Sequence, residues 1–285
     1  MHLIKLITLL FFIKNSYAQL NPTFHSLNLP LFEIGVGAIN IDVPYYPGSL
    51  KNQNRTLPLF WPIYRGEYFR LDQEGTRAKL TNKELYEIGI SAGFSFPIKN
   101  NDVNVREGMN DINYVIEIGP RFIYRIISNS SWHKLNFNLS LRSAFEVNEK
   151  NLRSKNIGIS GGPNFSYWIY LNKDKSASLF TNFGILYGDK KYNNFYYGVS
   201  AQYETTSRLP YLAEEGEISK RIFSRVAFNL HRDLQIFFGG FYSKIGGSRN
   251  IRSPLIETTT NSGFAIGFLW NIYKSEKIVS VFKKE

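Results

Sequence analysis

The chain of 285 residues carries 34 Lys and Arg against 23 Asp and Glu, contains no Cys, and is 43% hydrophobic and 16% aromatic. The lack of Cys excludes disulfides, Cys-based zinc sites and a Cys nucleophile. The positive charge suits nucleic acid, anionic lipid or an acidic polymer, and the export signal described next argues against nucleic acid.

Residues 1–18 have the pattern of a cleaved secretory signal. Lys5 precedes an apolar run from Leu6 to Ile13, and Ser16 and Ala18 are small residues at the positions that a signal peptidase reads. We therefore expect cleavage after Ala18. The apolar run is far shorter than the roughly 20 residues of a spanning helix, and no later run reaches that length.

The first part of the mature chain contains irregular strand signals. Residues 19–31 form a polar lead with two prolines, which we expect in the periplasm. Residues 32–43 alternate, but the alternation slips by one at Ala38 and Ile39, which predicts a β-bulge. Prolines within residues 57–64 predict only a weak or bent strand there.

The clearest strand signal covers residues 84–96. Its apolar positions Tyr86, Ile88, Ile90, Ala92, Phe94 and Phe96 alternate with Glu87, Gly89, Ser91, Gly93 and Ser95. One face is therefore aromatic and apolar enough to meet lipid, and the other is small or polar. This pattern is typical of a strand in a membrane barrel with a wet interior.

Similar strands are predicted along the rest of the chain. Their ranges are 112–127, 134–147, 157–171, 177–187, 217–230, 234–245 and 257–273, and two short pieces at 67–71 and 76–80 precede residues 84–96. Short connections alternate with long ones, and the longest irregular region is 188–216. The pattern predicts an all-β fold, an antiparallel transmembrane β-barrel of about 12 strands over residues 32–273 with a tail at 274–285. A soluble sandwich or barrel is the alternative, but it would fill its inner face with apolar side chains.

Two sets of residues are candidates for function. Charges predicted to point into the lumen are Glu117, Arg121, Arg125, Arg142 and Arg225. They either tune a basic channel or cross the lumen as ion pairs that plug it. A candidate binding surface at the barrel mouth consists of Tyr45, Tyr46, Ser49, Tyr196, Tyr197, Leu209 and Tyr211. We favour the plainer interpretation that these residues brace the loops and belong to the interfacial aromatic girdle.

Catalytic chemistry has little support in the sequence. His25, His133 and His231 are the histidines of the predicted mature chain, and two of them fall in predicted turns. No catalytic, cofactor-binding or metal-binding residues are predicted, and we expect a protein that is not an enzyme and needs no cofactor.

Several residue groups, in order along the mature chain, resemble the MipA/OmpV family of outer-membrane proteins, also described as MltA-interacting or scaffolding proteins. The groups are Gly35-Val36-Gly37, Tyr46-Pro47-Gly48-Ser49, Leu57-Pro58-Leu59, Phe195-Tyr196-Tyr197-Gly198-Val199-Ser200, Leu209-Pro210-Tyr211 and Asn261-Ser262-Gly263-Phe264. The chain departs from the pattern of outer-membrane barrels at its end, because Lys274 to Glu285 follow the aromatic Tyr273 that would close the last strand.

The resemblance implies a place in the outer membrane of a Gram-negative bacterium, in contact with outer-membrane lipid or glycolipid. It also implies that some members act as adaptors that bring a periplasmic murein transglycosylase together with a murein synthase. Other members resemble porins or adhesins. Our leading hypothesis is a scaffold that links murein hydrolase and synthase; a small-solute porin is the alternative, and an adhesin is third.

Overall fold

The computed structural model describes most of the chain between residues 28 and 280. The described ranges are 28–66, 69–72, 75–78, 85–127, 130, 132–245 and 249–280. The predicted signal at 1–18, most of the predicted lead at 19–31 and the tail beyond residue 280 lie outside these ranges. The boundaries proposed for those segments stay predictions.

Antiparallel strands, most of them long, make up most of the described chain. They are β1 (Asn28–Pro30), β2 (Phe32–Pro44), β3 (Asn52–Arg65), β4 (Phe69–Asp72), β5 (Gly75–Ala78), β6 (Tyr86–Ser95), β7 (Tyr114–Ile127), β8 (His133–Val147), β9 (Ser154–Tyr170), β10 (Ala177–Gly188), β11 (Gly216–Asn229), β12 (Leu234–Lys244), β13 (Thr260–Lys274) and β14 (Ile278–Ser280). The connections contain α2 (Lys190–Tyr197) and the 3-10 helices η2 (Asn100–Asp102), η3 (Asn104–Arg106) and η4 (Ala201–Tyr203). No helix in these ranges has both the length and the apolar character needed to cross a membrane.

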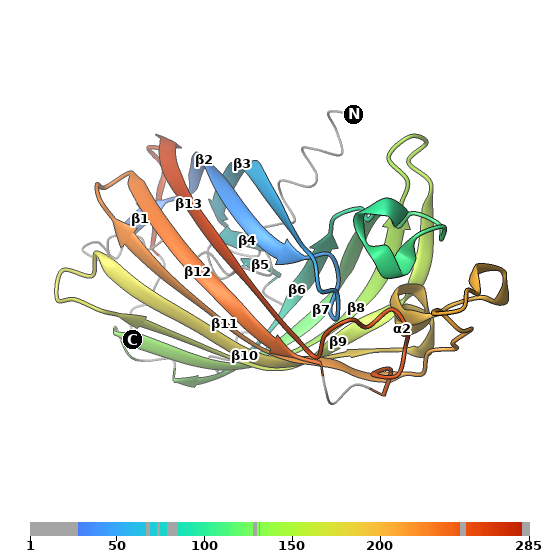
Figure 1. The fold of residues 1–285 in the computed structure, drawn as a ribbon. Coiled ribbons are helices and arrows are strands. Elements are labelled where there is room, and N and C mark those ends of the chain that lie inside the picture. Colours follow the sequence, from blue (N-terminus) through green and yellow to red (C-terminus); the bar gives the residue numbers. More distant parts are fainter. Residues whose placement is uncertain are drawn as a thin grey trace.

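The strands β2 to β13 form a closed antiparallel barrel. Their order is β10-β11-β12-β13-β2-β3-β4-β5-β6-β7-β8-β9, and β9 pairs with β10 again. The last long strand pairs with the first, so that Trp270 of β13 lies opposite Val36 of β2. Figure 1 shows these strands slanting side by side. The predicted fold class is confirmed, and strand pairing satisfies the backbone hydrogen bonds of the wall except where β3 faces β6.

The two ends of the barrel differ (Figure 1). Short connections such as 230–233 lie at one end, which we call the turn end. The other end, called the loop end, carries the connections 45–51, 96–113, 189–215 and 245–259. The region 189–215 was expected to be irregular, but it contains the helices α2 and η4.

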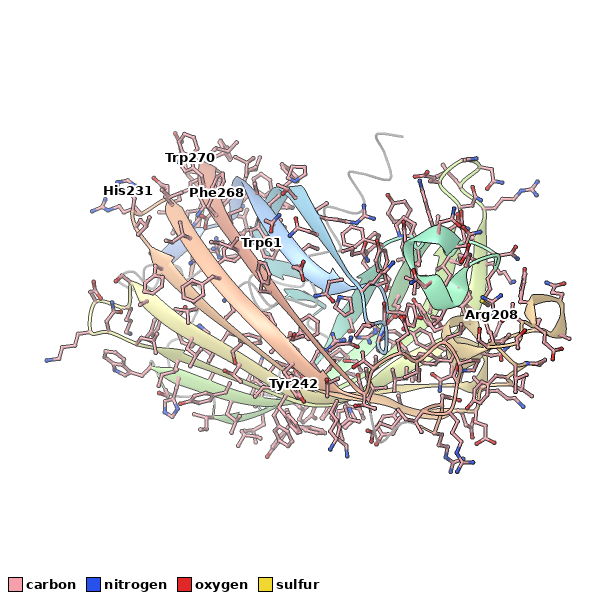
Figure 2. All side chains as sticks on the ribbon, viewed as in Figure 1. Trp61, Arg208, His231, Tyr242, Phe268 and Trp270 are labelled. Carbon is pink, nitrogen blue, oxygen red and sulfur yellow. The ribbon has the colours of Figure 1, made fainter. Side chains whose placement is uncertain are left out.

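Side chains alternate between the outer face and the lumen along the long strands. On β13 the outward residues are apolar, and Trp270 is 55% exposed. Figure 2 shows Phe268 and Trp270 on the outer side of this strand. Exposed apolar residues such as Phe122 on β7 and Leu141 on β8 continue the belt. An apolar belt of this kind suits lipid, as the alternation predicts.

The lumen has an apolar side that the alternation did not reveal. The buried residues of this inner apolar cluster are Ile39, Ile41, Leu59, Phe96, Ala227, Phe237 and Leu269. The register between β2 and β3 runs without a shift from Phe32 to Pro44. The prediction of a bulge at Ala38 and Ile39 is therefore wrong. The alternation of apolar residues only seems to slip there, because the apolar Ile39 and Ile41 point into the lumen.

Strand β3 is long and regular in its pairing, although its prolines predicted a weak strand. Pro58 and Pro62 pair with Ala38 and Ile34 of β2 in an unbroken register. On the opposite side, β4 pairs with β3 only near Arg65. Proline removes one backbone donor, and an edge without a full partner strand tolerates that loss.

The short hairpin β4–β5 leaves a seam in the wall between β3 and β6. β4 pairs with β3 only at Tyr64 and Arg65, and β5 pairs with β6 at Arg77 opposite Gly89. Nearer the loop end, side chains bridge the seam instead of backbone hydrogen bonds. The guanidinium of Arg55 on β3 lies 4.6 Å from the ring centroid of Phe96, just after β6.

Two aromatic residues predicted to face lipid instead fill this β3–β6 seam. Phe96 is only 4% exposed and belongs to the inner apolar cluster. The ring of Phe94 packs 5.4 Å from that of Phe96 and 5.5 Å from that of Tyr114, between centroids. The prediction of a lipid-facing position is wrong for Phe94 and Phe96, because here a short hairpin replaces a full neighbouring strand.

At the turn end, the start and the end of the described chain pair with each other outside the barrel. Asn28–Pro30 (β1) and Ile278–Ser280 (β14) form a two-stranded antiparallel ribbon. The amide of Leu31 donates to the carbonyl of Lys277 at 2.7 Å. Arg65 Nη1 donates to the carbonyl of Pro30 at 2.7 Å and to Glu33 Oε1 at 2.5 Å. The tail predicted after residue 273 is thus tied back to the barrel rim.

Candidate functional site

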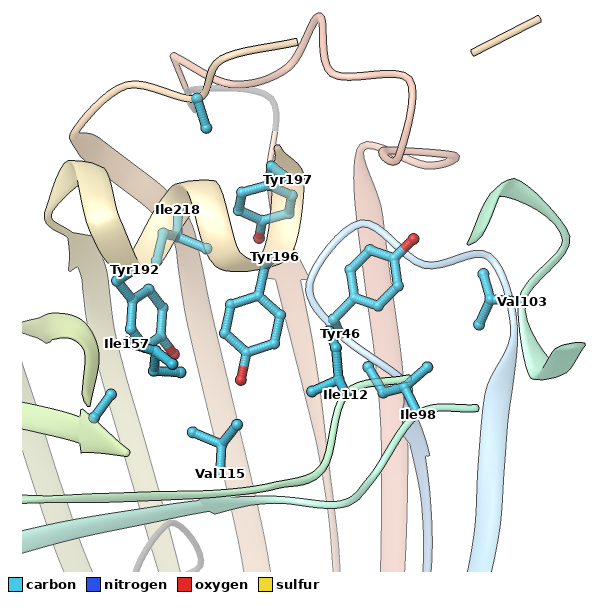
Figure 3. Packing of buried hydrophobic residues seen from close by; sticks show 12 residues of the cluster. Tyr46, Ile98, Val103, Ile112, Val115, Ile157, Tyr192, Tyr196, Tyr197 and Ile218 are labelled. Carbon is cyan, nitrogen blue, oxygen red and sulfur yellow. The ribbon is translucent and has the colours of Figure 1, made fainter. Parts of the chain in front are cut away.

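The loop end is closed by side chains that come from several connections. The closing residues, which we call the mouth cluster, are Tyr46, Ile98, Val103, Ile112, Val115, Ala144, Ile157, Tyr192, Tyr196, Tyr197, Ala213 and Ile218. Figure 3 shows Tyr192, Tyr196 and Tyr197 descending from α2 toward residues of the wall, with Tyr46 beside them. The cluster is a small apolar core built inside the barrel mouth.

Helix α2 is held in this position by its first turn. Asp189 is its N-cap, and the Asp189 carboxylate accepts from the amide of Tyr192 at 2.7 Å. This contact satisfies one of the free amides at the helix start. The Asn193 side chain donates to the carbonyl of Glu214 at 2.7 Å, which fastens α2 to the chain leading into β11.

Hydroxyl groups of the mouth cluster tie separate connections together. The Tyr197 hydroxyl donates to the carbonyl of Pro47 at 3.0 Å, and the Tyr46 hydroxyl donates to that of Leu255 at 2.7 Å. The hydroxyl of Ser253 donates to the carbonyl of Tyr197 at 2.7 Å. The connections 45–51, 189–215 and 245–259 therefore lock one another in place.

Burial raises the pKa of the Tyr46, Tyr192, Tyr196 and Tyr197 hydroxyls above the ordinary tyrosine value. The negative charge of Glu117 raises the pKa of Tyr192 and Tyr196 further. All four hydroxyls consequently stay protonated at neutral pH. Tyr46, Tyr192 and Tyr197 donate these protons in hydrogen bonds that tie the mouth cluster together.

The predicted mouth residues divide into a buried group and an exposed group. Tyr46, Ser49, Tyr196 and Tyr197 are all buried, and the carbonyl of Ser49 accepts from the Asn261 side chain at 2.7 Å. Their burial fits the bracing role, but the expectation of a lipid-facing girdle is wrong for Tyr46, Tyr196 and Tyr197.

The remaining predicted mouth residues lie farther from the centre. Tyr45 packs at the edge of the mouth cluster. Tyr211 forms a β-bridge with Val199 and also packs against the cluster. Leu209 is 62% exposed and points away from the packing. A binding role for these residues stays a prediction.

The five predicted lumen charges all lie on the inner wall, and Glu117 connects that wall to α2. Its Oε2 accepts from Arg142 Nε at 2.8 Å and from Ser160 Oγ at 2.7 Å. Its Oε1 accepts from the Tyr192 hydroxyl at 2.6 Å. An ion pair and two hydroxyls thus join β7, β8, β9 and the helix that fills the mouth.

The other lumen charges lie nearer the turn end. Arg121 and Arg225 are buried, and Arg125 forms an ion pair with Glu87. The ion pairs of Glu117 with Arg142 and of Glu87 with Arg125 join neighbouring strands, so both run along the wall and do not cross the lumen.

Sequence reasoning missed three residues of the inner wall. Arg65 and Glu33 form a buried ion pair on strands predicted to be irregular or weak. Arg221 lies inside β11 four residues before Arg225, and this even spacing places both on the same face of a strand. That spacing is the signal that would have identified Arg221.

A cavity of about 300 Å³ lies in the lumen against the mouth cluster. Its lining includes Tyr46, Tyr192 and Tyr196 from the cluster and Glu117, Arg142 and Arg221 from the wall. Glycines line much of the rest: Gly161, Gly162, Gly184, Gly239, Gly240 and Gly263. A Cβ at Gly161 would lie 2.1 Å from the carbonyl oxygen of Ser140, and one at Gly162 would lie 2.1 Å from that of Ile185, so these glycines let neighbouring strands approach closely.

Histidines and acidic groups do not gather in this site. The described ranges contain no group of three or more His, Asp or Glu side chains that could hold a metal ion. His231 lies at the turn end, where its Nδ1 is 3.9 Å from Asp233 Oδ2. Figure 2 shows His231 at the end of the barrel opposite to Arg208, which belongs to a long connection.

The chain is similar to several solved outer-membrane proteins at low sequence identity. An outer-membrane channel from Pseudomonas putida F1 is 8% identical, with a TM-score of 0.47, over 86% of this chain and 97% of its own. A bacterial polysaccharide outer membrane secretin is 9% identical, with a TM-score of 0.42, over 86% of this chain and 99% of its own. The NanC porin is 6% identical, with a TM-score of 0.35, over 83% of this chain and 98% of its own.

The search of curated protein sequences found no match. The family model described as MltA-interacting protein MipA matches residues 34–272, which is most of the chain. The chain, an outer-membrane β-barrel protein of a Gram-negative bacterium, therefore belongs to the MipA family.

Proposed function

We propose that this protein is a non-enzymatic, plugged barrel that acts as an envelope scaffold, holding a murein transglycosylase of the MltA type and a murein synthase at the outer membrane. The mouth cluster carries the proposal, because it fills the barrel where a porin would need an open path. The family description, MltA-interacting protein, supports the choice of the first partner.

The turn end offers a surface for such partners. In outer-membrane barrels short turns face the periplasm, where murein enzymes work. The ribbon of β1 and β14 projects there, and the described strands of the barrel do not pair with it. An unpaired strand edge can accept a strand from a partner through backbone hydrogen bonds. Exposed Lys274, Lys277 and Arg232 give this end a basic character.

Crosslinking in cells tests the scaffold role. A photoreactive phenylalanine at Lys277, which is exposed beside β14, should capture a murein transglycosylase or synthase. The same residue at Lys150, exposed in a loop-end connection, is the matched control and should capture neither enzyme. Recovery of no murein enzyme from Lys277, or equal recovery from both positions, would count against the scaffold.

The alternative, a small-solute porin, has one specific observation in its favour. Arg142 and Arg221 line the cavity, and Arg121 and Arg225 follow toward the turn end. Cationic groups on the inner wall would attract anions into an open lumen. The closed mouth argues against this role, and conductance measurements separate the two proposals, as discussed below.

A further inference from the structure

Among the described residues, the charges that line the lumen cavity do not balance. They are Glu117, Arg142 and Arg221, so the formal charge of this described lining is positive by one unit. The carboxylate of Glu117 already accepts from Arg142, Ser160 and Tyr192. The excess positive charge therefore belongs to Arg221.

The guanidinium of Arg221 packs against an aromatic ring and forms no ion pair with a described carboxylate. It lies 4.9 Å from the ring centroid of Phe241. Its buried Nε has no hydrogen-bond partner among the described residues, and no described carboxylate forms an ion pair with Arg221. Burying a guanidinium costs free energy unless an anion pairs with it.

The cavity lining is mixed, and its apolar part suits the body of a compact organic group. The apolar lining residues include Phe94, Phe96, Phe223, Phe241, Ile41 and Ala265, and polar residues such as Gln53, Asn164 and Asn182 line the rest. The volume of about 300 Å³ lies at the lower end of the range for small-molecule pockets, which is roughly 300–1,000 Å³. The planar fork of Arg binds a carboxylate through two parallel hydrogen bonds.

We propose that this cavity is a binding site for a small monocarboxylate with an apolar, preferably aromatic, body. The carboxylate pairs with Arg221, and the body lies against the phenylalanines and the glycine-lined wall. One negative charge neutralises the lining, whereas a neutral molecule would leave Arg221 unpaired. The site does not depend on the scaffold role, because it lies inside the barrel and away from the turn end.

Calorimetric titration of the refolded protein in detergent with sodium benzoate tests the site. We expect saturable binding in low-chloride buffer. Benzyl alcohol, which keeps the ring but lacks the charge, and sodium sulfate, which has charge but no apolar body, should each bind at least about tenfold more weakly. Equal binding of sulfate and benzoate, or no binding of benzoate, would overturn the proposal.

Variants assign the binding to this cavity. Arg221→Gln should weaken benzoate binding about tenfold or more, since a charged hydrogen-bonded pair is lost. Ala265→Leu keeps all the charges but fills the cavity, and it should abolish binding as well. Arg153→Gln, which removes an exposed arginine in a loop, should bind like the unaltered protein.

Folding of each variant is checked by the change of its gel mobility on heating. If Arg221→Gln does not fold, Ala265→Leu decides the question. Binding that is unchanged in a folded Arg221→Gln or Ala265→Leu variant would show that benzoate occupies another site and would refute the assignment.

Discussion

At the scale of single residues, Glu117 is the charged group that links the inner wall to the helix in the mouth. It is buried on β7 and accepts hydrogen bonds from β8, β9 and α2. We predict that Glu117→Ala lowers the free energy of unfolding by roughly 3–5 kcal/mol, because it leaves Arg142 buried without its partner. Urea titrations followed by tryptophan fluorescence in detergent measure this loss.

The matched control is another glutamate in an ion pair. Glu214 pairs with Arg249 at 3.6 Å, but both side chains are largely exposed. Glu214→Ala should cost only about 0–1 kcal/mol, as exposed pairs contribute little in water. If the two variants lose equal stability, the buried network is not the determinant that the structure suggests.

At the scale of elements, the β3–β6 seam is the weak part of the wall, because side chains replace strand pairing there. Arg55→Ala removes the contact between the guanidinium and the ring of Phe96, worth about 0.5–2 kcal/mol for a cation over an aromatic ring. We expect a lower temperature for the mobility change of the folded barrel on heating. The shift is measured by gel electrophoresis after stepwise heating.

Lys51→Ala provides the comparison, in the connection that leads into β3. Lys51 is exposed and donates to the Asn104 side chain at 2.9 Å. It should leave the transition almost unchanged because an exposed hydrogen bond is readily replaced by water. Similar shifts for both variants would mean that Arg55 has no special role in closing the seam.

At the scale of the whole molecule, a barrel closed at its loop end should not conduct. We predict that the purified protein is silent in a planar bilayer. A variant in which a short Gly-Ser linker replaces residues 190–213 should show steps that favour anions, because the described charges lining the lumen cavity are two arginines and one glutamate.

A second replacement controls for loss of any loop. Residues 148–153, the connection between β8 and β9, contribute no buried residue to the mouth cluster. Exchanging them for the same linker should leave the protein silent. Reproducible steps from the unaltered protein would contradict the plug and favour the porin.

The sequence was sufficient for the barrel, because alternation along a strand reports which face meets lipid. Residues 84–96 and 112–127 showed it most clearly, and the inward positions of Glu117, Arg121 and Arg142 followed from the same period of two. The family resemblance was likewise carried by short residue groups and was confirmed over residues 34–272.

Only the tertiary structure decided what the lumen and the mouth contain. Period-two alternation separates the two faces of a strand, but it does not reveal what stands opposite across the lumen. The meeting of Tyr46 with Tyr197, the inward Ile39 and Ile41, and the seam filled by Phe96 depend on barrel closure and strand length. Contacts between segments far apart in the chain have no local signal, which is why the sequence determined the wall and the fold determined what fills it.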